Sequence, residues 1–162
     1  MIIVSDTTPL MTLLKCDHLD LLKKMYGSVL IPSAVYNELT DNPHYEQEAK
    51  IIKDCDFLEV KEITNKERIR TLQNSTGLDL GETEALVLAE ITNADLLLMD
   101  EVMGRMIAKE MGFTIAGAIG ILIAAKTEGF LSADEIKITV SKLRSSGQHI
   151  GESLLKKLLE SN

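Results

Sequence analysis

Four acidic residues stand at well-separated points of the sequence where an apolar run ends or a helical pattern begins. Asp6 follows the mostly apolar run 1–5, and Asp100 follows the mostly apolar run 95–99. Glu38 lies in a helical pattern that comes after a third apolar run, and Glu82 lies near the start of another helical pattern. Ligands of an open α/β sheet bind outside the carboxyl ends of its strands, so we expect these acids to meet at one edge.

Carboxylates gathered in one pocket predict a bound cation. They cannot all stay ionised unless a positive charge compensates them. Mg²⁺ and Mn²⁺ prefer oxygen ligands and share them with substrate phosphates. Such an ion lowers the pKa of a bound water and polarises a phosphoryl group, so that no side-chain nucleophile is needed. The three histidines are scattered without ligand spacing, at His18, His44 and His149.

Other side chains near these acids are candidates for supporting roles. Glu84 and Glu101 are further candidate metal ligands, because Glu84 lies in the first turns of the same helical pattern as Glu82 and Glu101 directly follows Asp100. Thr7 and Thr8 are candidates for orienting a water or a substrate phosphate, or for helix capping. Arg105 lies about one turn after the acid at position 100, where binding a phosphate and pairing with an acid are both open.

The same acids also have structural interpretations. Asp6 and Asp100 have the position and residue type of helix N-caps. Asp79 and Glu82 have the D-x-x-E spacing of a capping box, in which the second acid folds back onto the backbone of the first. Spacing alone leaves the capping role and the metal role of Glu82 equally open.

Apolar runs and helical patterns alternate along the chain. We expect strands near 1–5, 28–31, 57–63, 95–99 and 113–115, and helices near 10–14, 19–26, 33–39, 46–53, 81–91, 102–111, 118–126, 133–143 and 152–159, with a loop at 74–77. Strands that are separated by helices pair in parallel, because a parallel pair needs a crossover connection. The pattern predicts an α/β fold, a three-layer α/β/α sandwich with a small, mostly parallel sheet.

Length and composition predict one domain over residues 1–162, with the last two helices (about 133–160) as a C-terminal extension. The chain is 45% hydrophobic but only 4% aromatic, so its core must be aliphatic. Cys16 and Cys55 have no metal-ligand spacing and are expected to be buried free thiols. No signal peptide and no membrane-spanning run is recognised, which predicts a cytoplasmic protein without a membrane partner.

The net charge of −8 argues against a protein that coats nucleic acid by bulk electrostatics. It does not exclude a nuclease, because divalent cations neutralise active-site carboxylates. A basic strip contains Lys61, Lys66, Arg68 and Arg70. These residues could follow an RNA backbone, although such a run is more commonly a solvated face.

The segments around the acids resemble the PIN-domain family, and within it the small prokaryotic branch related to VapC toxins. The matching segments are VSDTTPL (4–10), IPSAVYNEL (31–39), LDLGETEA (78–85) and LLMDE (97–101), and the likeness continues through 104–105 and 117–129. The resemblance implies a PIN-like, metal-dependent endoribonuclease with Asp6, Glu38, an acid at 82–84 and Asp100 around Mg²⁺ or Mn²⁺. Family spacing favours Glu82 over Glu84 as the third acid, so the resemblance makes Glu84 and Glu101 second choices as ligands.

The resemblance also implies an RNA substrate, a homodimer and, often, a small antitoxin protein that occludes the site of the toxin. The chain departs from the common pattern in two places, since it has Glu82 where Asp is more usual and adds Glu101.

Two other functions are compatible with the sequence. The segment 94–104 is similar to the phosphoacceptor strand of a receiver-like signalling module, but a receiver expects paired acids after its first strand and would leave Glu38 and Glu82 without a role. The second is a catalytically silent PIN-like domain that binds nucleic acid or protein. Four retained acidic positions favour the nuclease.

Overall fold

A parallel five-stranded sheet organises residues 1–160, the part of the chain that the computed structural model describes. In chain order its strands are β1 (Ile3–Ser5), β2 (Val29–Pro32), β3 (Leu58–Lys61), β4 (Leu96–Leu98) and β5 (Ile115–Ala116). Their spatial order is β3-β2-β1-β4-β5, and each neighbouring pair is parallel. β1 lies in the centre and is buried on both faces, as its apolar, β-branched sequence predicts.

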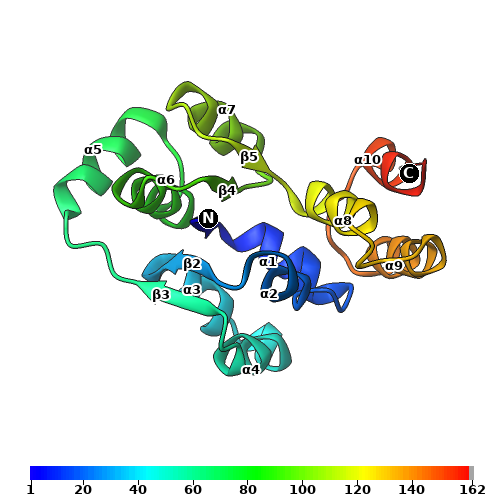
Figure 1. Ribbon diagram of the computed structural model, residues 1–162. Helices are drawn as coiled ribbons and strands as arrows, with labels where there is room; N and C mark the ends of the chain where they lie inside the picture. The colour runs from blue at the N-terminus through cyan, green and yellow to red at the C-terminus, as the bar shows by residue number, and fades with distance from the viewer. Residues whose placement is uncertain (161–162) are drawn as a thin grey trace.

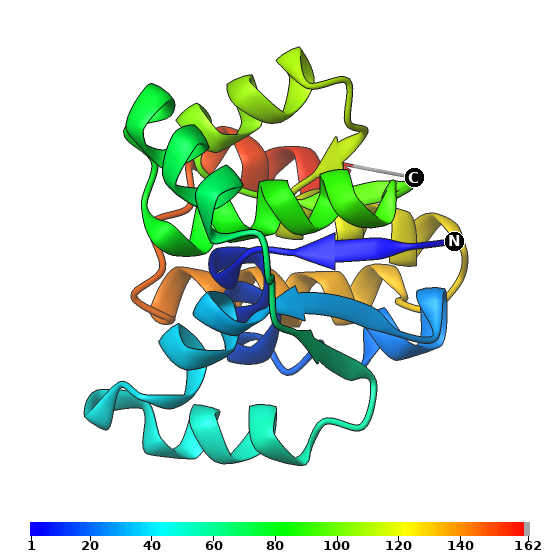
Figure 2. The same ribbon diagram turned by 90° about the vertical axis from the view of Figure 1, so that its left-hand side faces the viewer.

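Helices cover both faces of this sheet (Figures 1 and 2). One layer contains α5 (Lys66–Thr76), α6 (Leu80–Thr92) and α7 (Val102–Glu110). The opposite layer contains α1 (Thr7–Lys15), α2 (Leu21–Tyr26), α8 (Ala118–Thr127), α9 (Ala133–Ser145) and α10 (Glu152–Glu160). α3 (Ser33–Thr40) leaves the carboxyl end of β2 and packs on both α6 and α4 (Glu46–Asp54), with the short 3-10 helix η1 (Pro43–Tyr45) between α3 and α4. The predicted three-layer α/β sandwich is confirmed.

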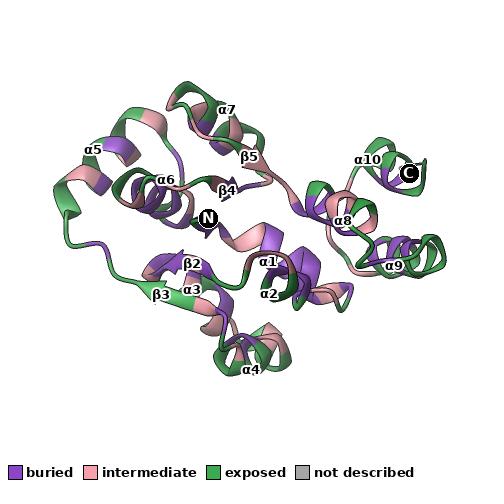
Figure 3. Ribbon diagram, in the orientation of Figure 1, coloured by how far each residue is buried: buried purple, intermediate pink, exposed green. Residues whose placement is uncertain are grey.

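Two aliphatic clusters hold the layers to the sheet, and Figure 3 shows their buried residues on the surfaces where helices and sheet meet. The cluster under α6 contains Leu86 and Val87. The other cluster joins Leu10 of α1 to residues of the two C-terminal helices, among them Leu143 and Leu155. The last two helices therefore share their core with the first helix of the chain. That they form a C-terminal extension of a single domain stays a prediction.

The expected loop at 74–77 is wrong, because residues 74–76 form the last turn of helix α5. Their polar composition predicts a turn, but Ile69 and Leu72 anchor the helix in the core. Its start is capped by the side chain of Asn65, which accepts from the backbone N–H of Arg68. The helix ends at Gly77, whose positive φ of 74° suits glycine. Tertiary packing overrides the weak local propensity of this segment.

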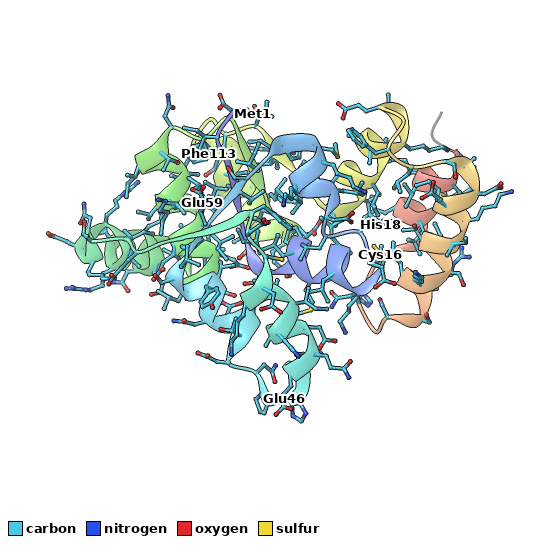
Figure 4. The ribbon with its side chains drawn as sticks, turned by 60° about the horizontal axis from the view of Figure 1, so that its bottom comes forward. Met1, Cys16, His18, Glu46, Glu59 and Phe113 are labelled. Atoms are coloured by element: carbon cyan, nitrogen blue, oxygen red, sulfur yellow. The ribbon has the colours of Figure 1, made fainter. Side chains whose placement is uncertain are left out.

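The remaining sequence-based expectations need small corrections. β5 lies at 115–116 rather than at 113–115. Both cysteines are free, but only Cys16 is buried, at the end of α1 beside α9 (Figure 4), while Cys55 is partly exposed. Within residues 1–160, no helix combines the length and the hydropathy that crossing a bilayer requires.

The shared core predicts that damage in α9 destabilises the whole chain. Leu143 is 1% exposed, so Leu143→Ala should lower the free energy of unfolding by about 2–5 kcal/mol. Ile138 lies on the same helix but is 58% exposed, so Ile138→Ala is the matched control and should change it by less than about 1 kcal/mol. Urea unfolding followed by circular dichroism measures both. A separate early transition in Leu143→Ala would show that the C-terminal helices unfold independently.

Candidate active site

The carboxyl edge of the sheet brings together the ends of its central strands and the starts of three helices, α1, α3 and α6 (Figure 2). Asp6 is the first residue after β1, and its backbone N–H donates to the carbonyl of Leu98 at the end of β4, at 3.0 Å. Asp100 follows β4 by two residues. The parallel pairing of Ser5 with Leu98 therefore places both acids at neighbouring strand ends.

Glu38 reaches this edge from α3. Val35 and Leu39 on the same helix are fully buried, which turns the neighbouring face toward the start of α1. There the hydroxyl of Thr7 donates to Oε2 of Glu38 at 2.8 Å, although the two residues are 31 positions apart in the chain. A hydroxyl donor orients the carboxylate without neutralising it.

Glu82 stands in the first turn of α6 and forms the capping box that its spacing allows. The carboxylate of Asp79 accepts from the Glu82 backbone N–H at 2.8 Å, and Oε2 of Glu82 accepts from the Asp79 backbone N–H at 3.3 Å. The capping interpretation is therefore confirmed. It does not exclude a ligand role, because a carboxylate has more acceptor sites than the one this hydrogen bond uses.

Asp6 has the most perturbed acidity of these residues. It is 3% exposed, and burial raises its pKa from 3.8 to about 7; the backbone N–H of Thr7 opposes this, and the negative charges of Glu82, Asp79 and Glu38 add to it. Burial likewise raises the pKa of Glu38 and of Glu82, with a further contribution from Asp79 in both cases. These four acids form one electrostatic group, called here the Asp6 cluster.

Asp100 has a different set of partners. Its two oxygens accept from the backbone N–H of Ala118 at the start of α8, both at 3.3 Å. Burial raises the pKa of Asp100, while the Ala118 N–H and the Arg105 guanidinium lower it and Glu101 raises it. Nη1 of Arg105 donates to the carbonyl of Met99 at 2.8 Å, so this cation is held beside Asp100.

Neither Asp6 nor Asp100 caps the helix that follows it. Asp6 occupies the N-cap position of α1 without a side-chain capping hydrogen bond. The N-cap of α7 is Glu101, whose own carboxylate accepts a long hydrogen bond of 3.5 Å from Thr8. The capping interpretation is therefore wrong for Asp100, while Asp6 holds the N-cap position without the side-chain hydrogen bond of a cap.

Glu84 forms its hydrogen bond with the start of helix α3. It is 7% exposed, and its Oε1 accepts from the backbone N–H of Ala34 at 3.1 Å. Ala34 belongs to the first turn of α3, where backbone N–H groups have no partner within the helix. Glu84 therefore holds the helix that carries Glu38, and the structure gives it a positioning contact.

Two glycines make room for the carboxylates, and sequence reasoning overlooked them. A Cβ at Gly81 would collide with the Glu38 carboxylate, and a Cβ at Gly117 would collide with that of Asp100. Gly81 sits in the first turn of α6, where glycine costs helix stability relative to alanine. A glycine inside a strong helical pattern, next to an acid, is the signal that could have found it. Asp79 was recognised only as a cap, and its charge on the Asp6 cluster was missed.

The donor chemistry of this edge fits a hard divalent cation. Its candidate ligands are all carboxylate oxygens, and the buried Asp6 is surrounded by like charges that a cation would offset. Within residues 1–160, however, no three His, Cys, Asp or Glu side chains converge closely enough to form a ready ligand set. The backbone brings the acids to one edge, and binding an ion requires their carboxylates to approach one another more closely.

Comparison with protein families identifies the chain. A family model described as a PIN domain matches residues 2–162. The chain belongs to the PIN-domain family. This match covers nearly the whole sequence and leaves the receiver-like interpretation without support. Comparisons with curated proteins and with solved structures find no match.

Membership in the PIN family agrees with the chemistry of the edge. PIN domains are generally nucleases, which act on nucleic acid and typically use divalent metal ions. The sequence alone predicted this family from the order of the four acidic segments along the chain. The assignment of individual ligands stays a prediction.

The raised pKa of Asp6 predicts a pH-dependent stability of the metal-free protein. The folded state holds the Asp6 proton up to about pH 7, whereas the unfolded state releases it near pH 3.8. This contribution is fully present below pH 3.8 and is lost as the pH rises through 7, at about 1.4 kcal/mol for each pKa unit. In EDTA, wild type should therefore lose more thermal stability than Asp6→Asn between pH 5 and pH 8. Equal losses in the two proteins would contradict the buried, raised Asp6.

Proposed function

We propose that this PIN domain is a divalent-metal-dependent endoribonuclease that hydrolyses RNA phosphodiester bonds. The observation that supports it most is the buried Asp6 at the end of the central strand, with three further carboxylates acting on its pKa. Burying an uncompensated negative charge is costly, and a site that collects several of them is suited to a bound cation. Either Mg²⁺ or Mn²⁺ fits this oxygen-only donor set.

In this proposal Asp6, Glu38, Glu82 and Asp100 hold the cation. The bound ion would supply an activated water and polarise the scissile phosphodiester. The chain's own residues orient the ligands: Thr7 holds Glu38, the Asp79 backbone holds Glu82, and the Ala118 N–H holds Asp100. Each donor is neutral, so the carboxylates keep the charge that attracts the ion.

Substrate contacts are assigned to three side chains at the same edge. The hydroxyls of Thr7 and Thr8 lie at the start of α1, one bonded to Glu38 and the other to Glu101. Arg105 offsets the negative charge of Asp100. In this proposal the Arg105 guanidinium also contacts a phosphate of the substrate. The basic strip at 61–70 is a weaker candidate, because Arg68 forms a bidentate ion pair with Glu90.

The cellular role in this proposal is that of a cytoplasmic VapC-like toxin. It would act as a homodimer and be held inactive by a small antitoxin protein. The support is the sequence resemblance to that branch. A catalytically silent PIN domain is the alternative, and the variants below separate the two.

Removal of single carboxylates tests the ligand assignment. Asp6→Asn and Asp100→Asn should each reduce Mn²⁺-dependent cleavage of single-stranded or transfer RNA by at least about a hundredfold, because each removes a negative ligand. Glu82→Gln should reduce it as well while leaving the capping acceptor in place. Gel-resolved cleavage under single-turnover conditions gives the rates.

Glu84→Gln is the matched control. It keeps the oxygen that accepts from Ala34, so cleavage should stay within about twofold of wild type if Glu84 only positions α3. A large loss in Glu84→Gln with normal cleavage by Glu82→Gln would reverse the choice of third ligand. Absence of metal-dependent cleavage by the wild-type protein, with no Mn²⁺-induced thermal shift, would favour the silent domain.

The close approach of Gly81 to Glu38 gives a test that leaves every acid in place. Gly81→Ala should favour helix α6 but force the Glu38 carboxylate away from its present position. We expect an unchanged or higher melting temperature in EDTA together with a smaller stabilisation by Mn²⁺. Thermal unfolding at a series of Mn²⁺ concentrations measures both quantities. An undiminished Mn²⁺ effect would show that Glu38 is not a ligand in its present place.

A further inference from the structure

A hollow of about 460 Å³ opens beside the Asp6 cluster, on the side of α1 and α3. It shares Thr7 and Glu38 with the acidic edge, and Thr8 also contributes to both. The rest of its wall comes from segments that sequence reasoning did not connect with the site. A cavity of this size is in the range of small-molecule pockets.

Lys15, in the last turn of α1, contacts two segments that contribute to the wall of this hollow. Its Nζ lies 4.9 Å from the ring centroid of Tyr45 and donates to the carbonyl of Ser146 at 3.3 Å. Tyr45 ends η1, directly before Glu46, which Figure 4 marks at the start of α4. The hydroxyl of Ser146 in turn accepts from the backbone N–H of Gln148. A cation over an aromatic ring is a favourable contact, so Lys15 links both the ring and the 146–148 segment to α1.

The remaining lining is rich in unused hydrogen-bonding groups. In the described part of the chain, the carboxamides of Asn37 and Gln148 have no hydrogen-bond partner. Asn42 uses its oxygen to accept from His44, which leaves its two amide N–H donors available. The acceptors are the carboxylates of Asp41 and Glu38.

This combination matches the chemistry of a nucleobase. Proteins that read unpaired RNA bases stack them on aromatic rings and hydrogen-bond to their edges with amide and carboxylate side chains. A phosphate is a poor match for the interior, because Asp41 and Glu38 are negative and Lys15 already has two partners. Exocyclic amino groups, which adenine, guanine and cytosine carry and uracil lacks, suit these acceptors.

We propose that the hollow lined by Tyr45, Asn37 and Asp41 binds one unpaired, amino-bearing nucleobase of the substrate RNA. This inference rests on the proposed function, because it identifies the base next to the phosphate that the acidic edge holds. The shared residues Thr7 and Glu38 make the two sites continuous. Tyr45 and the amides are binding residues that set which RNA is cut, and they take no part in the hydrolytic step.

The experiment measures base binding apart from catalysis. Saturation-transfer NMR in EDTA gives the affinity of the full chain for adenosine, guanosine, cytidine and uridine, all of which lack a phosphate. We expect the three amino-bearing nucleosides to bind at least about fivefold more tightly than uridine. Tyr45→Leu should weaken their binding by about tenfold through loss of stacking. Asp41→Asn should reduce the discrimination against uridine.

Matched controls separate the site from general effects. Phe130→Leu removes an exposed aromatic ring between α8 and α9, and Asp54→Asn removes an exposed acid on α4. Neither residue lines the hollow, so both variants should bind nucleosides as wild type does. Should Tyr45→Leu fail to fold, Asn37→Ala replaces it, because Asn37 is exposed and its side chain supports no other residue. Its affinity for the amino-bearing nucleosides should fall, and an unchanged affinity overturns the proposal.

The outcomes distinguish this inference from the proposed function. Metal-dependent RNA cleavage together with nucleoside binding that is unaffected by Tyr45→Leu, Asp41→Asn and Asn37→Ala overturns the base site and leaves the nuclease standing. Nucleoside binding that requires Tyr45, in a protein that cleaves no RNA, supports the base site and overturns the nuclease. Equal binding of uridine and the other three nucleosides overturns the amino-group preference and the inference with it.

Discussion

The burial of a negative charge at the end of the central strand is the constraint on which the site depends. β1 is flanked by β2 and β4 and covered on both faces, so the residue that follows it has little access to water. Desolvation makes the ionised form of Asp6 unfavourable, and the neighbouring acids add to this because their like charges repel it. The chain tolerates the arrangement through its aliphatic cores, which stabilise the sheet without any help from the acidic edge. Either a proton on Asp6 or a bound cation offsets this electrostatic destabilisation.

The other acids are held by neutral hydrogen-bond donors rather than by ion pairs. A hydroxyl holds Glu38, and backbone N–H groups hold Glu82 and Asp100. Such donors fix the direction of a carboxylate while leaving its charge and most of its lone pairs available. Exposed ion pairs lie elsewhere in the described part of the chain, such as Arg68 with Glu90 and Arg144 with Glu152. The separation keeps positive charge from neutralising the Asp6 cluster.

Much of the architecture could be predicted from the sequence, because its strands are short apolar runs and its helices have strong apolar periodicity. The parallel sheet and the burial of β1 on both faces follow from these patterns, and so does the place of Asp6 and Asp100 just after two strands. Helix α5 could not be predicted from local sequence, because its residues are mostly polar and its helix is anchored by the packing of Ile69 and Leu72 in the core. Local spacing also gave no indication that Glu84 holds the start of α3 while Glu82 takes part in the acidic cluster. That distinction depends on which face of α6 meets a helix fifty residues earlier in the chain.

The contacts of Lys15 have a consequence for how this fold diversifies. One ammonium group ties the Tyr45 turn to the segment after α9, so two stretches about a hundred residues apart in the chain jointly shape the hollow. Both stretches lie outside the regular helices and strands that carry the acids, and such connecting segments accept insertions and substitutions more readily. Selection can therefore remodel what the hollow admits by changing turns at either place. The acidic edge, built on the sheet and the helix starts, would pass through such changes unaltered.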